Sequence, residues 1–129
     1  MILRTGFLAA AAFIACSQAH AAEATMSINF VGDWCYSSQE DKTTSYTLPS
    51  WTEGGRCTNI LSIQPDVFYG EGRNCEPVNI RFSKKVAPSG TAYTALVVAH
   101  CQPDGPVVQG QRLTFEFYRY KGRLTVTAK

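Results

Sequence analysis

The sequence predicts an all-β domain, a small antiparallel meander of seven or eight strands that is closed into a barrel or pressed into a sandwich and held by two disulfide bonds. Three observations predict it. Short segments alternate apolar and polar residues with the period of two that half-buried strands show. Turn residues separate these segments, and no stretch after the leader has helical periodicity. Closing or stacking such a sheet protects its edge strands.

Residues 1–21 have the features of a signal peptide. Arg4 supplies the positive start, residues 6–15 form an apolar core too short to span a bilayer, and Ala19-His20-Ala21 matches the small-x-small cleavage pattern. We therefore expect cleavage after Ala21, one domain over residues 22–129, and a soluble protein in the periplasm or the medium. In an alternative interpretation Cys16 accepts a lipid, which would anchor the protein to a membrane.

Removal of the leader leaves four cysteines, an even number that predicts a disulfide framework in an exported protein. Their spacing contains no C-x2-C pair, so a zinc site is not expected. Three pairings are open. The hairpin register described next selects Cys75 with Cys101, which leaves Cys35 with Cys57, and each bridge should stabilise the fold by roughly 3 kcal/mol.

Residues 73–102 predict a long β-hairpin with its turn at residues 87–90, Ala-Pro-Ser-Gly. A hairpin symmetric about Pro88 sets Cys75 opposite Cys101. The same register predicts three further facing pairs on its strands: Glu76 with His100, Val78 with Val98, and Ile80 with Leu96.

Before this hairpin, residues 24–36 predict the first strand, because Met26, Ile28 and Phe30 alternate with polar residues. Gly32 interrupts the alternation and predicts a bend, and Trp34 is large enough to plug one end of a barrel. Residues 57–62 and 67–69 predict two short strands around the turn Gln64-Pro65-Asp66.

The triplet Gly32-Asp33-Trp34 resembles the G-x-W of the first strand in lipocalins and their calycin relatives. The resemblance implies a lipocalin-like barrel whose floor is closed by Trp34 beneath an arginine from near the C-terminus, Arg119 or Arg123. It also implies a carrier of a small apolar ligand. The order G-x-W-C, G-R-C, a lone Cys and A-x-C is similar to that of small secreted proteobacterial β-domain proteins, a resemblance that brings no activity with it.

After the long hairpin, residues 112–128 predict a final hairpin that turns at Lys121-Gly122. This turn sets Phe117 opposite Val126 and Arg119 opposite Leu124. The charges of the chain are uneven, since residues 22–55 hold five acids and one base while residues 112–129 hold five bases and one acid. In a closed meander the first and last strands are neighbours, so we expect a favourable contact between the two segments.

The net charge of +2 excludes the strongly basic surface of a nucleic-acid-binding protein. Glu76 and His100 are the one pair that suggests catalysis, with the carboxylate orienting the imidazole of a hydrolase. No nucleophile motif, phosphate loop or dinucleotide fingerprint accompanies them, and one histidine in the mature chain makes a transition-metal site improbable. We expect no cofactor and no metal, and favour a protein that is not an enzyme.

Two segments are candidates for binding. Residues 37–55 predict the longest connection, with at most a short strand over residues 45–48, and Trp51 as either its binding residue or a cap that folds back on the barrel. The tip of the final hairpin interleaves Tyr118, Arg119 and Tyr120 with further cations and suits an anionic or sugar partner. The leading prediction is therefore a monomeric, non-catalytic binding module, for example a hydrolase inhibitor. The alternatives are a calycin-like carrier and a hydrolase using Glu76 and His100.

Overall fold

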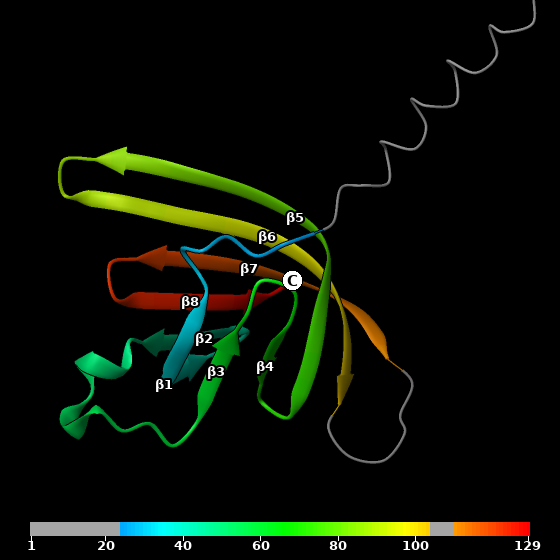
Figure 1. Ribbon diagram of the computed structural model, residues 1–129, viewed down its shortest axis with the longest axis horizontal. Helices are drawn as coiled ribbons and strands as arrows, with labels where there is room; N and C mark the ends of the chain where they lie inside the picture. Colours follow the sequence, from blue (N-terminus) through cyan, green and yellow to red (C-terminus); the bar gives the residue numbers. More distant parts are fainter. Residues whose placement is uncertain (1–23, 104–109) are drawn as a thin grey trace, which may run out of the picture.

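A computed structural model describes residues 24–103 and 110–129, so the predicted signal peptide, its cleavage site and Cys16 lie outside the described residues. Within these residues the fold has eight strands and two short 3-10 helices (Figure 1). Among the described residues, no helix is long and apolar enough to cross a bilayer. The elements are β1 (Gly32–Glu40), β2 (Thr43–Thr47), η2 (Pro49–Trp51), η3 (Glu53–Gly55), β3 (Ile60–Ile63), β4 (Phe68–Gly70), β5 (Arg73–Ala87), β6 (Gly90–Pro103), β7 (Gln111–Tyr120) and β8 (Arg123–Ala128).

The strands form a closed antiparallel barrel in the order β1-β2-β8-β7-β6-β5-β4-β3, which confirms the predicted fold class and selects the barrel over the sandwich. Strands β3 to β8 form a meander. The β1–β2 hairpin is inserted between its two ends, with β1 beside β3 and β2 beside β8. The prediction that the first and last strands are neighbours is therefore wrong, because β3 occupies the edge of β1 that β8 would need.

The seam between β2 and β8 is polar rather than ionic. The hydroxyls of Thr43 and Thr127 hydrogen-bond across it at 2.9 Å. The one salt bridge recorded in the described part of the chain joins Lys129 to Glu116 at 2.9 Å, so both of its partners come from the basic C-terminal segment. The expected ion pairing between acidic and basic ends is thus not what holds the seam.

The long hairpin of β5 and β6 has two registers separated by a bulge. Cys75 pairs with Cys101 and Glu76 with His100, as predicted. Beyond the irregularity between Pro77 and Asn79 the pairing shifts by one residue, so that Ile80 faces Val97. The predicted pairs of Val78 with Val98 and Ile80 with Leu96 are wrong, because Ala87 pairs with Gly90 and the turn is not symmetric about Pro88.

The bulge allows both halves of β5 to face the barrel interior. Cys75 and Ile80 are an odd number of residues apart, so a regular strand would point them to opposite sides. The extra residue, Val78, restores the phase and is itself exposed. The buried face of β6 is formed by alternate residues: Ala95, Val97, Ala99 and Cys101.

The segment before β1 is not the predicted strand over residues 24–36. Met26 and Phe30 are buried, whereas Ile28 between them is 79% exposed. The backbone N–H of Phe30 donates to the carbonyl oxygen of Ser27 at 2.9 Å, which makes a turn, and the N–H of Met26 donates to Pro65 at 2.7 Å. The chain therefore buries every fourth residue here, and β1 begins only at Gly32, whose φ of 136° is accessible to glycine.

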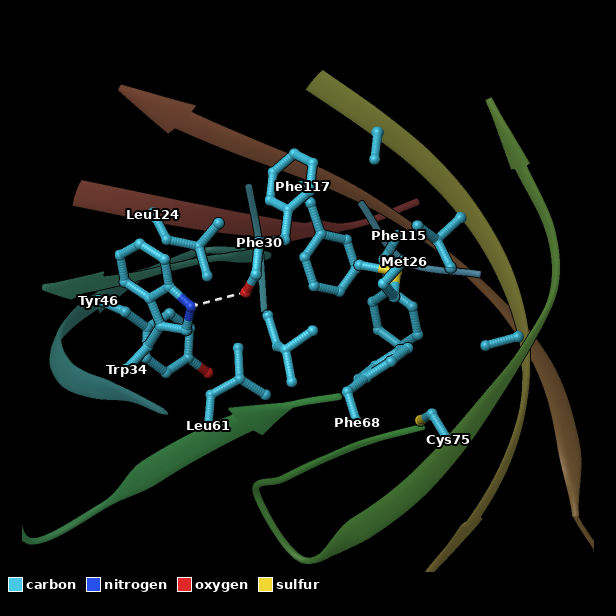
Figure 2. Close-up of a cluster of buried hydrophobic side chains, with 14 of the residues drawn as sticks. Met26, Phe30, Trp34, Tyr46, Leu61, Phe68, Cys75, Phe115, Phe117 and Leu124 are labelled. Atoms are coloured by element: carbon cyan, nitrogen blue, oxygen red, sulfur yellow. Dashed lines mark hydrogen bonds between the residues drawn. The ribbon is translucent and has the colours of Figure 1, made fainter. Parts of the chain in front are cut away.

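Side chains fill the barrel (Figure 2). Phe68 and Phe117 pack edge to face with ring centroids 5.2 Å apart, and Phe30 approaches Phe117 in the same way at 6.1 Å. Such contacts combine a large buried apolar area with favourable ring electrostatics. The fully buried large side chains are Trp34, Phe30, Phe117, Ile63, Leu124 and Val97.

Trp34 closes one end of the barrel, as its position in the sequence predicts. Its indole N–H donates to the carbonyl oxygen of Phe30 at 2.9 Å (Figure 2). The guanidinium carbon of Arg119 lies 4.9 Å from the centre of the Trp34 ring, and Arg119 also donates to the carbonyl oxygen of Asn29 at 2.6 Å. The arginine of the Trp34 contact is thus Arg119 and not Arg123.

The two disulfides connect Cys35 with Cys57 and Cys75 with Cys101, as predicted. The final hairpin also has its predicted register, with Phe117 opposite Val126 and Arg119 opposite Leu124. Residues 37–55, by contrast, are not one long connection, because β1 continues to Glu40 and β2 follows a tight turn at Asp41-Lys42. The predicted short strand over residues 45–48 is part of β2.

Candidate binding site at the open end of the barrel

The end of the barrel opposite Trp34 has a gap in its wall. Strand β3 pairs with β1 only over Gly32–Cys35, and the last bond on this side is donated by the Tyr36 N–H to the carbonyl oxygen of Asn59 at 2.9 Å. Beyond Tyr36, β1 continues to Glu40 and pairs with β2 along one edge, while β3 no longer pairs with its other edge. The turn between β4 and β5, at Glu71-Gly72, borders the gap from the other side.

Glu71 is held in this turn in a backbone conformation that few residues adopt. Its φ is 53° and that of Gly72 is 74°, the two positive values that a tight hairpin turn requires. Asn, Asp and Gly are the usual residues at the first position, and a longer side chain there carries a strain of about 1 kcal/mol. Asp41 and Lys121 have similar φ values, 54° and 55°, in two other hairpin turns, so it is the contacts of the Glu71 side chain that distinguish it.

The Glu71 carboxylate reaches from the turn to the interior face of β2. Its Oε1 accepts hydrogen bonds from the Tyr46 hydroxyl at 3.3 Å and from the Thr44 hydroxyl at 3.4 Å. Tyr46 and Thr44 are both buried, so these bonds satisfy polar groups at the mouth of an apolar core. The Tyr46 ring in turn meets the Tyr36 ring edge to face at 6.4 Å.

Burial raises the pKa of Tyr46 above its ordinary value, and the charge of Glu71 raises it further. The phenol is therefore a protonated hydrogen-bond donor at every physiological pH. It directs one carboxylate oxygen of Glu71 and leaves Oε2 without a recorded partner in residues 24–103 and 110–129.

A hollow of about 460 Å³ lies over this arrangement. Its wall contains two tyrosines, one carboxylate, two carboxamides and a hydroxyl, and no basic side chain lines it. The lining residues are Tyr36, Gln39, Tyr46, Thr58, Asn59, Ile60, Glu71 and Gly72. Three smaller hollows adjoin Glu71 and bring Arg73 close to the same mouth.

The candidate catalytic pair does not form a site. Glu76 and His100 face each other across β5 and β6, as the register predicts, but both are exposed. His100 alternates with the buried Ala99 and Cys101, so it lies on the outer face of the barrel, where its ring packs against Gly110. No ion pair between the two is recorded. Neither residue lines any of these four hollows.

The four predicted binding residues do not converge either. Arg119 packs over the Trp34 ring at the closed end of the barrel. Tyr120 donates its hydroxyl to the carbonyl oxygen of Ser89 at 3.0 Å, which ties two hairpins together. Tyr118 lies outside on β7. Trp51 is 54% exposed and folds back over the turn of the final hairpin, where a Cβ added at Gly122 would lie 2.5 Å from its ring.

The sequence analysis missed the residues of the hollow. Gly70-Glu71-Gly72 reads as a plain turn, and Tyr36 and Tyr46 lie on either side of a hairpin that was not predicted. One signal was present. A glutamate between two glycines stands where Asn or Asp is the usual turn residue, and this mismatch between side chain and turn indicates a role for the side chain.

The fold and the hollow define the class of this protein as a small disulfide-bonded antiparallel barrel with a packed interior and one open, polar end. Comparisons of the chain with protein-family models, with curated proteins and with solved structures find no match. In the described parts of the chain, no group of three His, Cys, Asp or Glu side chains is arranged to hold a metal ion.

Proposed function

We propose that the protein is an exported, non-catalytic binding module that holds its ligand in the hollow at the open end of the barrel. The observation that carries this proposal is the Glu71 carboxylate, held in a strained turn and oriented by Tyr46 beneath a hollow of about 460 Å³. The packed interior supports the same choice. The hollow that reaches the core residues Phe68, Phe115 and Phe117 measures only about 40 Å³, room for a water and not for a carried apolar ligand.

The lining favours a neutral ligand rich in hydroxyl groups, such as an oligosaccharide. Gln39, Asn59 and Thr58 offer both donors and acceptors, and the free oxygen of Glu71 is a strong acceptor. The half-exposed Tyr36 ring provides an apolar face on which a sugar ring can stack. An anionic ligand is disfavoured, because Glu71 would repel it and no base lines the hollow.

The test is an NMR titration of the isotope-labelled protein, exported with its own leader, with the neutral sugar triacetylchitotriose and separately with maltotriose. We expect shift changes that concentrate on residues 36–39, 58–60 and 71–72 for at least one sugar. Tyr36→Ala should weaken that binding about tenfold through loss of the stacking face. Tyr118→Ala is the matched control, since Tyr118 and Tyr36 are similarly exposed, at 42% and 40%.

Two results would count against the proposal. Equal weakening by both variants would mean that the sugar binds through tyrosines in general. Shift changes confined to core residues such as Val97 and Phe117, with an apolar dye in place of the sugar, would favour the carrier instead.

A further inference from the structure

Strand β5 has a long edge without a partner. It spans fifteen residues but pairs with β4 only over Arg73–Cys75. Over Glu76–Ala87, the edge of β5 that faces β6 is paired. The opposite edge, which β4 leaves uncovered, receives no backbone hydrogen bond from the described residues. In Figure 1 the far ends of β5 and β6 reach beyond the turn that joins β7 and β8.

The outer half of this edge is accessible. Every residue from Arg81 to Val86 is exposed, and Val86 reaches 71%. The strand is nevertheless well supported. Phe82 stacks on Tyr93 of β6 with ring planes 24° apart, and the Tyr120 hydroxyl bonds to Ser89 in the hairpin turn. The edge is therefore an ordered template of free N–H and C=O groups.

The charge of the edge has one sign. Arg81, Lys84 and Lys85 lie within five residues, and no acidic residue occurs anywhere between Pro77 and Ala99. Arg81 and Lys85 lie on one face of the strand, whereas Lys84 shares the other face with the exposed apolar side chains of Phe82 and Val86. An incoming strand would thus meet two cations on one face, and an apolar surface with a third cation on the other.

We propose that an extended acidic segment of a partner protein adds to the free edge of β5 as a ninth strand. Backbone hydrogen bonds along Arg81–Val86 would provide the affinity. Arg81 and Lys85, two cations on one face, would select for glutamate or aspartate at alternate positions, and Lys84 would add to the positive field. This surface is separate from the hollow at the open end, so the inference goes beyond ligand binding.

The charges also decide against a second copy of this chain as the occupant. Two β5 edges related by a twofold axis run antiparallel, which brings the cations of one copy opposite those of the other. Like charges facing each other across a strand pair are destabilising. The same cations that admit an acidic segment therefore keep the protein from pairing with itself.

The experiment uses the protein exported with its own leader and a capped ten-residue peptide that alternates glutamate with valine. Amide hydrogen exchange is measured with and without the peptide, and affinity is measured by fluorescence anisotropy of a labelled form. We expect new protection at backbone amides within residues 81–86 and an affinity that falls as salt is raised. Replacing Arg81, Lys84 and Lys85 with glutamine should weaken binding about tenfold.

The matched control replaces three exposed bases elsewhere, Arg56, Arg112 and Arg123, with glutamine, which gives the same net charge. Binding of the peptide to this control should be unchanged, and a peptide with lysine in place of glutamate should not bind. Equal weakening in both triple variants would reduce the effect to net charge and overturn the inference. Protection at the β1 edge instead of β5, or binding to phosphatidylglycerol vesicles with no peptide-induced protection, would overturn it as well.

Discussion

At the scale of single residues, the contact between Trp34 and Arg119 shows how strand parity selects one of two candidate residues. Alternate residues of β7 face the interior, and Arg119 follows Phe115 and Phe117 on that side. Arg123 is exposed at the start of β8. The guanidinium of Arg119 lies over the Trp34 ring and binds two carbonyl oxygens, those of Asn29 and Lys121. It therefore links the segment before β1 to the last hairpin.

Replacing Arg119 should cost much more stability than replacing Arg123. Arg119→Met removes a cation–π contact and two charge-assisted hydrogen bonds, for which we expect a loss of about 2 kcal/mol in the free energy of unfolding. Arg123→Met should stay within about 0.5 kcal/mol. Urea unfolding of the two variants, followed by tryptophan fluorescence, measures the difference. Similar losses in both would show that Arg119 contributes only surface charge.

At the scale of elements, the bulge in β5 reconciles two constraints that a regular strand cannot meet together. The disulfide fixes Cys75 toward the interior opposite Cys101, and the apolar outer half needs Ile80 on the same side. Since these positions differ in parity, one residue must be looped out, and Val78 takes that place between Pro77 and Asn79. Proline, which cannot donate to the ladder, suits this position.

Because of the bulge, two nearby apolar residues of β5, Val78 and Ile80, should contribute differently to the stability of the fold. Ile80→Ala should destabilise the protein by about 2 kcal/mol, because Ile80 packs against the core cluster. Val78→Ala should change stability by less than about 0.5 kcal/mol, because the looped-out side chain lies in solvent. Paired thermal and urea unfolding curves check both values. A larger loss for Val78 than for Ile80 would favour the symmetric register over the bulged one.

The same elements show how far the sequence predicts this molecule. Period-two alternation and turn residues predicted the final hairpin to the residue, because its two-residue turn and its apolar face agree. The central hairpin was right at Cys75 and wrong at Ile80, since a bulge leaves no reliable mark in alternation alone. Residues 24–31 alternate apolar and polar residues as a strand does, but they form a turn that buries Met26 and Phe30. Tertiary packing determines this conformation, and local alternation does not predict it.

The candidate site was less predictable than the fold. Its side chains come from β1, β2, the start of β3 and one turn, and they meet only because the β1–β2 hairpin is inserted between β3 and β8. That insertion depends on which strand edges pair, and period-two patterns do not specify edge partners. The predicted site residues Tyr118 and Tyr120 share the outer face of β7, where Tyr120 bonds to Ser89, whereas Arg119 between them faces inward.

At the scale of the whole molecule, the barrel has two unlike ends around an interior without room for cargo. Trp34 and Arg119 seal one end, while Glu71 and Tyr46 lie at the polar mouth of the other. Aromatic rings from opposite walls meet in the middle, so the interior is filled by side chains (Figure 2). Two disulfides supplement the stability that a core of this limited size provides.

A filled interior predicts that an internal cavity must be created before an apolar ligand can bind there. Phe117 is fully buried and contacts Phe30, Phe68 and Phe115, so Phe117→Ala should cost about 3 to 5 kcal/mol and leave a cavity lined by aromatic rings. Benzene should raise the melting temperature of this variant and leave that of the unmodified protein unchanged. Phe82→Ala, which truncates an exposed ring at the rim, should gain no benzene response. Stabilisation of the unmodified protein by benzene would mean that its interior opens to apolar molecules, and the carrier function would then take precedence over binding at the open end.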